Sequence, residues 1–358
     1  MLIFAVETSC DETACAVGSG RKILANVVYS QAVHSQWGGV VPHLAKKEHQ
    51  IKLPSIINLT LKKLKRVRKE ADLNKITAFA VTYGPGLAPA LETGIKQTKL
   101  LAEEYSKPII PVNHLEGHIY SVFVQNSQGR PDFKFDFPYL CLIISGGHTQ
   151  LSLFYDHLQH KIIGKTLDDA AGEALDKAGK LLGLGYPSGA VIERLSEAVE
   201  NKDFYNFPRT MIKHNSLDFS FSGLKTAFYY FVKDKSQRFI TDNINKLASS
   251  FQQAVFESVI IKLESAIKKT GVKNLIVCGG VSANKHLKTT IRQLARKHQA
   301  KVLFPRYDYL YGDNAAMIAV AGYYRYRQGY YLAGDEFDLL DRKPRLNLED
   351  KFIWKTKK

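Results

Sequence analysis

Two parts of the chain share one order of apolar segments and short polar turns. In the first part, the apolar or alternating segments occupy residues 2–9 (LIFAVETS), 13–20 (TACAVGSG) and 22–31 (KILANVVYSQ). In the second part, they occupy residues 139–146 (YLCLIISG), 149–156 (TQLSLFYD) and 160–168 (HKIIGKTLD). Short segments of this kind between polar turns are typical of β-strands. Because the layout repeats although the residues differ, the pattern predicts two related α/β domains that face one another.

Longer segments with helical periodicity follow each set of strands, at residues 41–66 and 168–183. Two further units each combine a strand, a glycine-containing turn and a helix, at residues 78–105 and 274–298. The turn of the second unit is Gly-Gly, and backbone N–H groups at such a turn and helix start suit an anion or a nucleotide. The chain contains neither a Walker A motif nor a GxGxxG motif, which counts against the P-loop and Rossmann classes.

The length of 358 residues is enough for two domains with buried cores. We predict a first domain at residues 1–135 and a second at residues 136–328. The last helix of the second, near residues 313–328, is predicted to pack back on the first domain. Residues 329–358 are polar and irregular, and are predicted to form a basic tail. No apolar run approaches the ~20 residues of a membrane span, so we expect no membrane association.

Charge is the most unusual property of the composition. Fifty Lys and Arg residues against 34 Asp and Glu residues give a net charge of +16, which favours a polyanionic partner such as nucleic acid; a compositional bias towards lysine is the alternative. The four cysteines are scattered without a CxxC pair, which suits a reducing compartment. The N-terminal segment lacks a basic region and reaches an acidic residue at Glu7, unlike a signal peptide. We therefore expect a cytoplasmic protein.

The segment HLEGH at residues 114–118 contains two histidines four positions apart. On a helix with about 100° per residue, His114 and His118 lie about 40° apart, within reach of one metal ion. Glu116 lies about 200° from His114, on the other side of the helix. In the metalloprotease box HExxH, the glutamate follows the first histidine directly and acts as a base beside the metal. Glu116 cannot do this from the same helix, so the geometry argues against a metallopeptidase.

A metal site needs at least one further ligand. The best candidate is Asp313 in YGDNAAMIA, at the start of an apolar helix. Two imidazoles and a carboxylate suit zinc or iron, with positions left open for water or substrate. The alternative is a pair of ordinary histidines at the end of a helix.

Seven motifs then point to a known family. They are ETSCDET, HLEGH, SGGHTQL, LDDAAGEALDKAGKLLGLGYPSG, FSFSGLKTA, GGVSANK and DNAAMIA, in that order along the chain. Together they resemble the tRNA N6-adenosine threonylcarbamoyltransferase family, formerly described as O-sialoglycoprotein endopeptidases. The resemblance covers about residues 1–325, and two of the motifs, SGGHTQL and FSFSGLKTA, resemble the bacterial and organellar branch. Several independent motifs at compatible spacing make the resemblance specific.

The resemblance implies the fold of actin and the sugar kinases (the ASKHA fold), with two related α/β domains and a nucleotide cleft between them. It implies transfer of the threonylcarbamoyl group from threonylcarbamoyl-adenylate (threonylcarbamoyl-AMP) to N6 of an adenine, with release of AMP. That adenine is at position 37, just 3′ of the anticodon, in tRNAs that read codons beginning with A. Because a fold hosts many chemistries, this implication rests on the motifs and not on the fold.

The resemblance also implies roles for individual residues. The residues carried over as contacts of the adenylate are Ile143, Ile144, Ser145, Gly146, Gly147, Asp176, Gly189 and Asn284. The residues that match the family's metal ligands are His114, His118 and Asp313. For Asp176, the alternative is a surface carboxylate paired with Lys180. One divalent ion, Fe or Zn, is expected per subunit.

The adenine N6 must lose a proton as it attacks, and Asp11 or Glu12 in ETSCDET are the candidates to accept it. The expected partners are tRNA and, by resemblance, a degenerate paralogue subunit and a small P-loop ATPase. Two other functions stay open at this point. One is a small-molecule kinase of the same fold, and the other, disfavoured by the position of Glu116, is a metallopeptidase.

Overall fold

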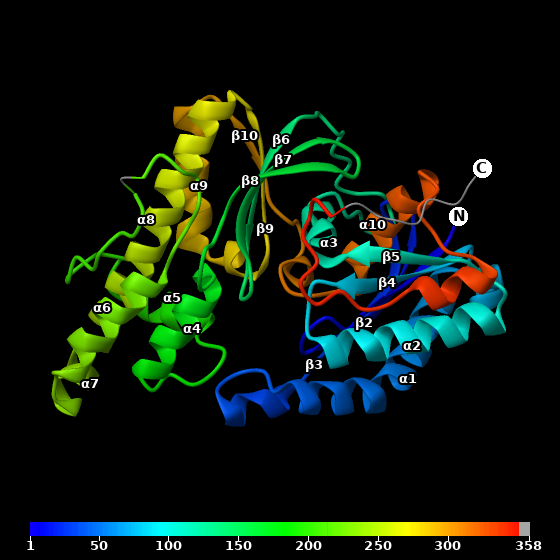
Figure 1. Cartoon of the computed structure of the whole chain (residues 1–358), viewed down its shortest axis with the longest axis horizontal. Helices are drawn as coiled ribbons and strands as arrows, with labels where there is room; N and C mark the ends of the chain where they lie inside the picture. The colour runs from blue at the N-terminus through cyan, green and yellow to red at the C-terminus, as the bar shows by residue number, and fades with distance from the viewer. Residues whose placement is uncertain (213, 351–358) are drawn as a thin grey trace.

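The computed structural model describes residues 1–212 and 214–350 and contains two five-stranded sheets (Figure 1). The strands of the first sheet are β1 (Ile3–Glu7), β2 (Glu12–Ser19), β3 (Lys22–Ser30), β4 (Ala78–Gly84) and β5 (Ile109–Asn113). Their order in the sheet is β3-β2-β1-β4-β5, in which β1 is antiparallel to β2 and parallel to β4. The antiparallel strands β1 to β3 therefore form one side of the sheet, and the parallel strands β4 and β5 form the other.

The second sheet repeats this arrangement. Its strands are β6 (Tyr139–Ile144), β7 (Thr149–Asp156), β8 (Gln159–Lys165), β9 (Asn274–Cys278) and β10 (Lys301–Leu303). Their order is β8-β7-β6-β9-β10, with β6 antiparallel to β7 and parallel to β9. The six strands predicted from the two repeated patterns are all present, and the prediction of two related α/β domains of the ASKHA type is confirmed.

The helices belong to two groups. Those around the first sheet are α1 (Pro42–Val67), α2 (Ala88–Glu104), α3 (His114–Ser121) and α10 (Ala315–Arg327). Those around the second are α4 (Ala171–Leu181), α5 (Gly189–Glu197), α6 (Ser222–Lys233), α7 (Gln237–Asp242), α8 (Ile244–Thr270) and α9 (Lys285–Lys297). The 3₁₀ helices are η1 (Ala32–Trp37), η2 (Leu73–Lys75), η3 (Gly280–Ala283), η4 (Asp308–Leu310) and η5 (Gly334–Leu339). Among the described residues, no helix combines the length and the apolar character that a bilayer span requires.

Side chains alternate between the two faces of a strand, and this alternation divides the core. On β1, Phe4 and Val6 pack with apolar residues of α1 and α2, whereas Ile3 and Ala5 pack with α3 and α10. On β6, Leu140, Leu142 and Ile144 pack under α4, α8 and α9, and the alternate residues face the α3–α10 layer. The α3–α10 layer is thus shared by both sheets.

The chain after α10 returns to the first sheet. The amide of Lys343 donates to the carbonyl of Tyr83 (2.7 Å), at the end of β4. The side-chain amide of Asn113 donates to the carbonyl of Asn347 (2.9 Å), at the end of β5. Leu346 and other apolar side chains of this segment are buried. Residues 351–358 of the predicted basic tail lie outside the described residues.

Candidate functional site

The first cluster of predicted site residues lies where β5 ends. The Asn113 side chain accepts a hydrogen bond from the amide of Leu115 (2.9 Å), which caps α3 and starts the helix at His114. One turn apart, the rings of His114 and His118 have centroids 4.6 Å from each other. Their Nε2 atoms each lie 3.3 Å from Oδ1 of Asp313, which precedes α10. The structure therefore brings the three predicted metal ligands together.

The donor set fits a divalent ion. Zinc–nitrogen distances of about 2.0–2.1 Å in a tetrahedral site place neighbouring ligand atoms about 3.3–3.4 Å apart, and one ligand atom from each of the three residues lies within 4.8 Å of the others. Burial opposes the charge of Asp313, but the His114 and His118 imidazoles hold the pKa of that carboxyl well below its usual range. The carboxylate is thus ionised, which is the state that coordinates a cation.

Glu7 holds His114 in place, a role that the sequence analysis did not predict. Oε2 of this fully buried residue lies 3.2 Å from Nδ1 of His114, and Oγ of Ser9 lies 3.1 Å from the same nitrogen. The hydroxyl of Thr82 and the amide of Ser9 donate to the Glu7 carboxylate at 2.5 Å and 2.6 Å. With a proton on Nδ1 directed at Glu7, the Nε2 of His114 would be free to ligate a metal ion beside Asp313, as outer carboxylates arrange for metal-bound histidines.

The two candidate proton acceptors lie where the turn after β1 meets β2, Asp11 as the last residue of the turn and Glu12 as the first residue of β2. Burial raises the pKa of Glu12 well above its usual range, and the charges of Asp313 and Asp11 raise it further. His49 of α1 anchors the turn, because its Nε2 donates to the carbonyl of Cys10 (2.9 Å). The charge of Asp313 therefore acts on Glu12, which in turn lies beside Asp11.

The predicted nucleotide side of the site is the turn between β6 and β7. Ser145 and His148 close this turn through a hydrogen bond from the Ser145 amide to the His148 carbonyl (2.8 Å). The turn follows Ile143 and Ile144, both fully buried at the end of β6. No atom lies within 4 Å of the Cβ that an alanine would add at Gly146 or Gly147, so this side of the turn is open to a ligand.

Two glycines that were not predicted as site residues pack closely against the backbone at this turn. A Cβ at Gly172 of α4 would lie 2.6 Å from the carbonyl oxygen of Ser145. Gly279, at the end of β9, has φ +92°, and a Cβ there would lie 2.6 Å from the carbonyl oxygen of Ile144. Because both contacts are with backbone atoms, only glycine allows so close an approach. Both residues belong to motifs named above, LDDAAGEALDKAGKLLGLGYPSG and GGVSANK, but the motifs do not indicate which residues these glycines contact.

Asp176 and Gly189 meet at the start of α5. The Asp176 carboxylate accepts a hydrogen bond from the amide of Ser188 (2.7 Å). Burial raises the pKa of Asp176, although the amides of Ser188 and Gly189 partly offset this effect. Asp176 is thus a half-buried acceptor for this turn rather than a surface partner of Lys180. Gly189 has no atom within 4 Å of an added Cβ and faces open space.

Asn284 is engaged within the protein. Its Oδ1 accepts from the amide of Leu287 (3.0 Å) and caps α9, and its Nδ2 donates to Oε1 of Gln252 (2.9 Å). Its role as a contact of the adenylate stays a prediction.

Comparisons with known proteins assign the chain. The family model described as tRNA N6-adenosine threonylcarbamoyltransferase matches residues 22–320. The chain belongs to this family. A relative of that name from Thermosipho africanus is 43% identical over 92% of this chain and 96% of its own length. A relative of the same name from Riemerella anatipestifer is 40% identical over 92% of this chain and 94% of its own length.

Solved structures support the fold. The crystal structure of T. kodakarensis HypF has a TM-score of 0.56 at 13% identity, over 92% of this chain and 48% of that one. Full-length HypF in its phosphate- and nucleotide-bound form has a TM-score of 0.56 at 12% identity, over 90% of this chain and 54% of that one. This chain thus spans about half of each HypF chain, and at this identity the likeness concerns the fold alone.

Two further side chains bear on the family's chemistry. Glu116 points away from the histidine pair and lies with Oε2 2.7 Å from Nε of Arg325, so it cannot act as a metallopeptidase base. Tyr186 lies in the turn before α5. Burial raises the pKa of the Tyr186 phenol above its usual range, and the charges of Asp11 and Asp176 raise it further. The sequence analysis did not single out Tyr186.

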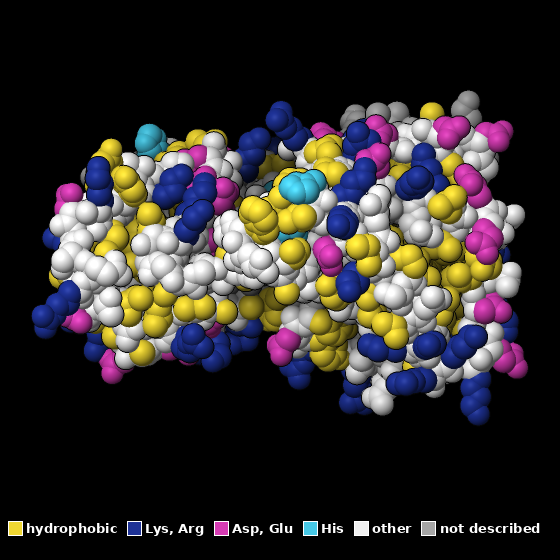
Figure 2. All heavy atoms as spheres, turned by 90° about the horizontal axis from the view of Figure 1, so that it is seen from below, with side chains coloured by type: hydrophobic (Ala, Val, Ile, Leu, Met, Phe, Trp, Pro, Cys, Tyr) yellow, Lys and Arg dark blue, Asp and Glu magenta, His cyan; other side chains and the backbone are white. Residues whose placement is uncertain are grey.

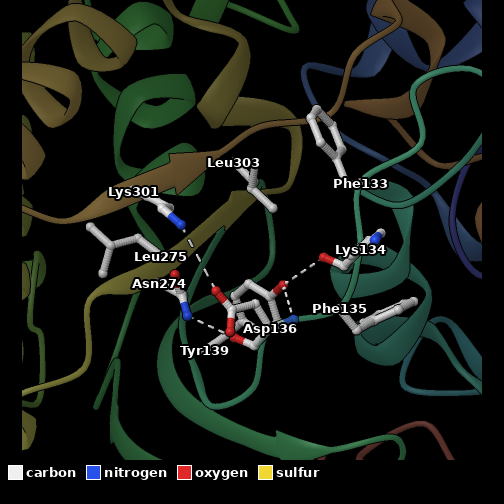
Figure 3. A pocket seen from close by; sticks show the side chains of 9 residues that line it. All are labelled: Phe133, Lys134, Phe135, Asp136, Tyr139, Asn274, Leu275, Lys301 and Leu303. Atoms are coloured by element: carbon white, nitrogen blue, oxygen red, sulfur yellow. Dashed lines mark hydrogen bonds and ion pairs between the residues drawn. The ribbon is translucent and has the colours of Figure 1, made fainter.

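A separate cavity of about 430 Å³ lies at the other end of the second sheet (Figure 3). Tyr139, Asn274 and Lys301, the first residues of β6, β9 and β10, line it. The predicted nucleotide turn follows the opposite, C-terminal end of β6. Ligands of parallel sheets bind beyond the carboxyl ends of the strands, so this cavity is not the predicted site.

Proposed function

We propose that this chain transfers the threonylcarbamoyl group of threonylcarbamoyl-adenylate to N6 of the adenine at position 37 of tRNAs that read codons beginning with A, and releases AMP. Membership of the family supports this proposal, since the relatives bear the name of the transfer activity. The observation that carries it to this chain is the convergence of His114, His118 and Asp313 beside the carboxylates of the β1–β2 turn.

The reaction forms one bond and breaks one. The lone pair of the adenine N6 attacks the carbonyl carbon of the mixed anhydride, and a C–N bond forms. The C–O bond to the phosphate breaks, and AMP leaves with the electron pair. The proton lost by N6 needs an acceptor, for which we propose Asp11 or Glu12, because the charge of Asp313 acts on Glu12, which in turn lies beside Asp11.

We propose that the adenylate lies against the β6–β7 turn. Ile143, Ile144 and Ser145 lead to the open backbone of Gly146 and Gly147, where N–H groups can approach the phosphate without side chains in the way. Asp176 and Gly189 would contact the ribose and the adenine, and Asn284 would add a further contact on the nucleotide. Ile143 to Gly147 lie at the β6–β7 turn, Gly189 begins α5, and Asp176 of α4 contacts the turn before α5 through the Ser188 amide.

We propose that His114, His118 and Asp313 hold one divalent ion, zinc or iron. Such an ion would supply Lewis-acid stabilisation of the charge that develops on the substrate. Elemental analysis of the purified protein identifies the metal, and treatment with a chelator followed by separate addition of each metal identifies the one that restores transfer.

We propose tRNA as the polyanionic partner, in the cytoplasm. Seen from the side of α1, Lys and Arg side chains are exposed on both lobes of the molecule (Figure 2). An anticodon loop is single-stranded, so its base can enter a pocket without the opening of a duplex. We further propose a degenerate paralogue subunit and a small P-loop ATPase as partners, which rests on the family resemblance.

The experiment combines the purified chain with unmodified tRNA and threonylcarbamoyl-adenylate, with and without the two proposed partner proteins. Mass spectrometry of the digested tRNA should detect threonylcarbamoyladenosine, and a tRNA with guanine at position 37 should stay unmodified. ATP with a panel of sugars tests the kinase alternative in parallel. If no modified adenosine forms even with both partners present, the proposed function is wrong.

Two variants test the proton acceptor. Loss of an acid–base group typically lowers the rate by about 10²–10⁴-fold, so Asp11→Asn or Glu12→Gln should lower kcat by this amount. Glu70→Gln is the matched control, since the Glu70 side chain is 91% exposed and pairs with Lys75 on the surface. If both variants keep the kcat of the control, neither carboxylate is the acceptor.

A further inference from the structure

Glu116, the central residue of HLEGH, lies on the face of α3 that the histidines do not occupy. Glu116 is 3% exposed and its carboxylate lies 2.7 Å from Nε of Arg325, which is 5% exposed and belongs to the last turn of α10. His160 of β8 lies on the same side, with Nε2 4.0 Å from Oε1 of Glu116. A charged pair therefore crosses the interface between α3 and α10 in the interior.

Gly117 brings the same two helices close together. A Cβ at this position would lie 2.8 Å from Cδ1 of Ile318 and 3.2 Å from Cγ of Met317, both on α10. Asn314, the residue after Asp313, caps the start of α10, because its side chain accepts a hydrogen bond from the Met317 amide (3.0 Å). Both ends of α10 are thus fixed relative to α3.

These contacts act on the predicted metal ligands because the ligands come from the same two helices. His114 and His118 project from α3, and Asp313 directly precedes α10. Asp313 and Arg325 are twelve residues apart, which corresponds to about 18 Å along a helix. On α3, Glu116 lies on the opposite side of the helix from the two histidines, so the ion pair with Arg325 and the contacts with Asp313 hold α3 from two sides.

The narrow range of metal–ligand distances shows why the position of α3 matters. Metal–ligand distances must be met within about 0.2 Å, whereas a slip of α3 by one residue along its axis moves a histidine by about 1.5 Å. Apolar packing sets where α3 lies in the core, but apolar contacts are not directional. A hydrogen-bonded ion pair has a narrow range of favourable geometry.

We propose that Glu116 and Arg325 are positioning residues, whose ion pair fixes α3 on α10 so that the two histidines stay aligned with Asp313. This inference rests on the metal site of the proposed function. It assigns no chemical step to either residue. It accounts for the glutamate of HLEGH by its effect on ligand geometry rather than on stability, because replacement of a buried ion pair by apolar side chains is often neutral for stability.

The test measures metal affinity rather than transfer alone. Purified full-length chains are stripped of metal, and zinc affinity is measured by competition with a chromogenic chelator. Glu116→Gln keeps the shape of the side chain but removes its charge, and Arg325→Lys keeps the charge but removes the Nε donor. Substitution of a residue that orients metal ligands typically costs about 10–100-fold in metal affinity. We expect a loss in this range for both variants.

A control separates positioning from general stability. Phe228→Leu alters the buried core of the second domain, away from α3, and destabilises the fold without contact with α10. At a similar loss of Tm, this variant should bind zinc as the unaltered chain does. The visible spectrum of the cobalt-loaded protein should change in Glu116→Gln and stay constant in Phe228→Leu, because it reports ligand geometry.

Each outcome decides the inference. Unchanged zinc affinity in a folded Glu116→Gln or Arg325→Lys variant overturns it, and so does an equal loss in Phe228→Leu. If Glu116→Gln does not fold, Arg325→Lys decides, since it retains the buried charge pair. An unaltered chain that catalyses transfer but binds no metal refutes this inference and leaves the proposed function intact. A chain that binds metal but does not modify tRNA refutes the function, and the affinities still test the positioning role.

Discussion

Replacement of Gly172 by alanine is expected to weaken the binding of adenylates while the protein stays folded. Gly172 lies in the first turn of α4, and its amide donates to the carbonyl of Ser145 (3.2 Å). A Cβ at this position would lie 2.6 Å from that carbonyl oxygen and 2.8 Å from Cα of Gly146. Both neighbours are backbone atoms, so no side chain can rotate to relieve the contact.

The size of the effect follows from these distances. Ordinary contact of a Cβ begins at 3.4 Å, so α4 and the β6–β7 turn must separate by about 0.8 Å, the difference between 3.4 and 2.6 Å. Overpacking of this kind typically costs about 1–3 kcal/mol in unfolding free energy. A misplacement of about 1 Å in a site can cost about 10²-fold in rate. We expect the KM for threonylcarbamoyl-adenylate and the Kd for AMP to rise at least about tenfold.

The assay combines calorimetric titration with AMP, steady-state transfer kinetics and urea unfolding. Gly223→Ala is the matched control, because Gly223 is also the second residue of its helix, α6, and its added Cβ meets only the Thr210 methyl at 3.2 Å. That methyl can move, so AMP affinity and stability should stay close to those of the unaltered chain. A folded Gly172→Ala protein with unchanged AMP affinity would refute the placement of the adenylate at this turn.

Three further predictions follow from single contacts. Glu7→Gln should weaken zinc binding about 10–100-fold, because it removes the charge that orients His114; chelator competition measures this, and unchanged affinity contradicts it. Leu346→Ala should lower the unfolding free energy by at least about 2 kcal/mol in urea titrations, since this side chain packs over the first sheet. His298 and Lys297 hold the pKa of Glu264 at about 2. Because this pKa is depressed on folding, the stability advantage over Glu264→Gln should be present at neutral pH and decline as the pH falls from about 5 to about 2.

The strands were predictable because their burial is regular. Residues 3–7 and 139–144 are completely buried, and both precede alternating strands with polar turns between them. The order of strands within a sheet was not read from the sequence, since it depends on pairings between distant segments, such as β1 with β4 and β6 with β9. Only the repeated layout indicated that the two sheets share one order. The helix α8 (Ile244–Thr270), the longest in the second domain, was not predicted at all.

The candidate site also combines features that the sequence predicts with features that it does not. The pairing of His114 with His118 follows from helical periodicity, which is a local property. Glu7 lies 107 residues from His114 along the chain, and its carboxylate reaches the ring only because β1 and β5 lie in one sheet. The charge of Asp11 acts on Tyr186 of the other domain, an effect that depends on how the domains pack. Contacts of this kind leave no periodic signal in the sequence.

The position of α3 explains why one site can draw residues from both domains. Leu115 and Ile119 of α3 share a buried apolar cluster with Ile143 of β6 and Cys278 of β9, as well as with α10. The two halves are therefore joined by a continuous apolar core next to the metal ligands. To widen the gap between the histidines and the β6–β7 turn, the molecule would have to expose part of this core, at a cost of about 25 cal/mol for each Å² of apolar surface. The distance between the predicted metal site and the predicted nucleotide turn is thus set mainly by core packing around α3. We therefore expect substitutions on the side of α3 opposite the two histidines to change the geometry of the site.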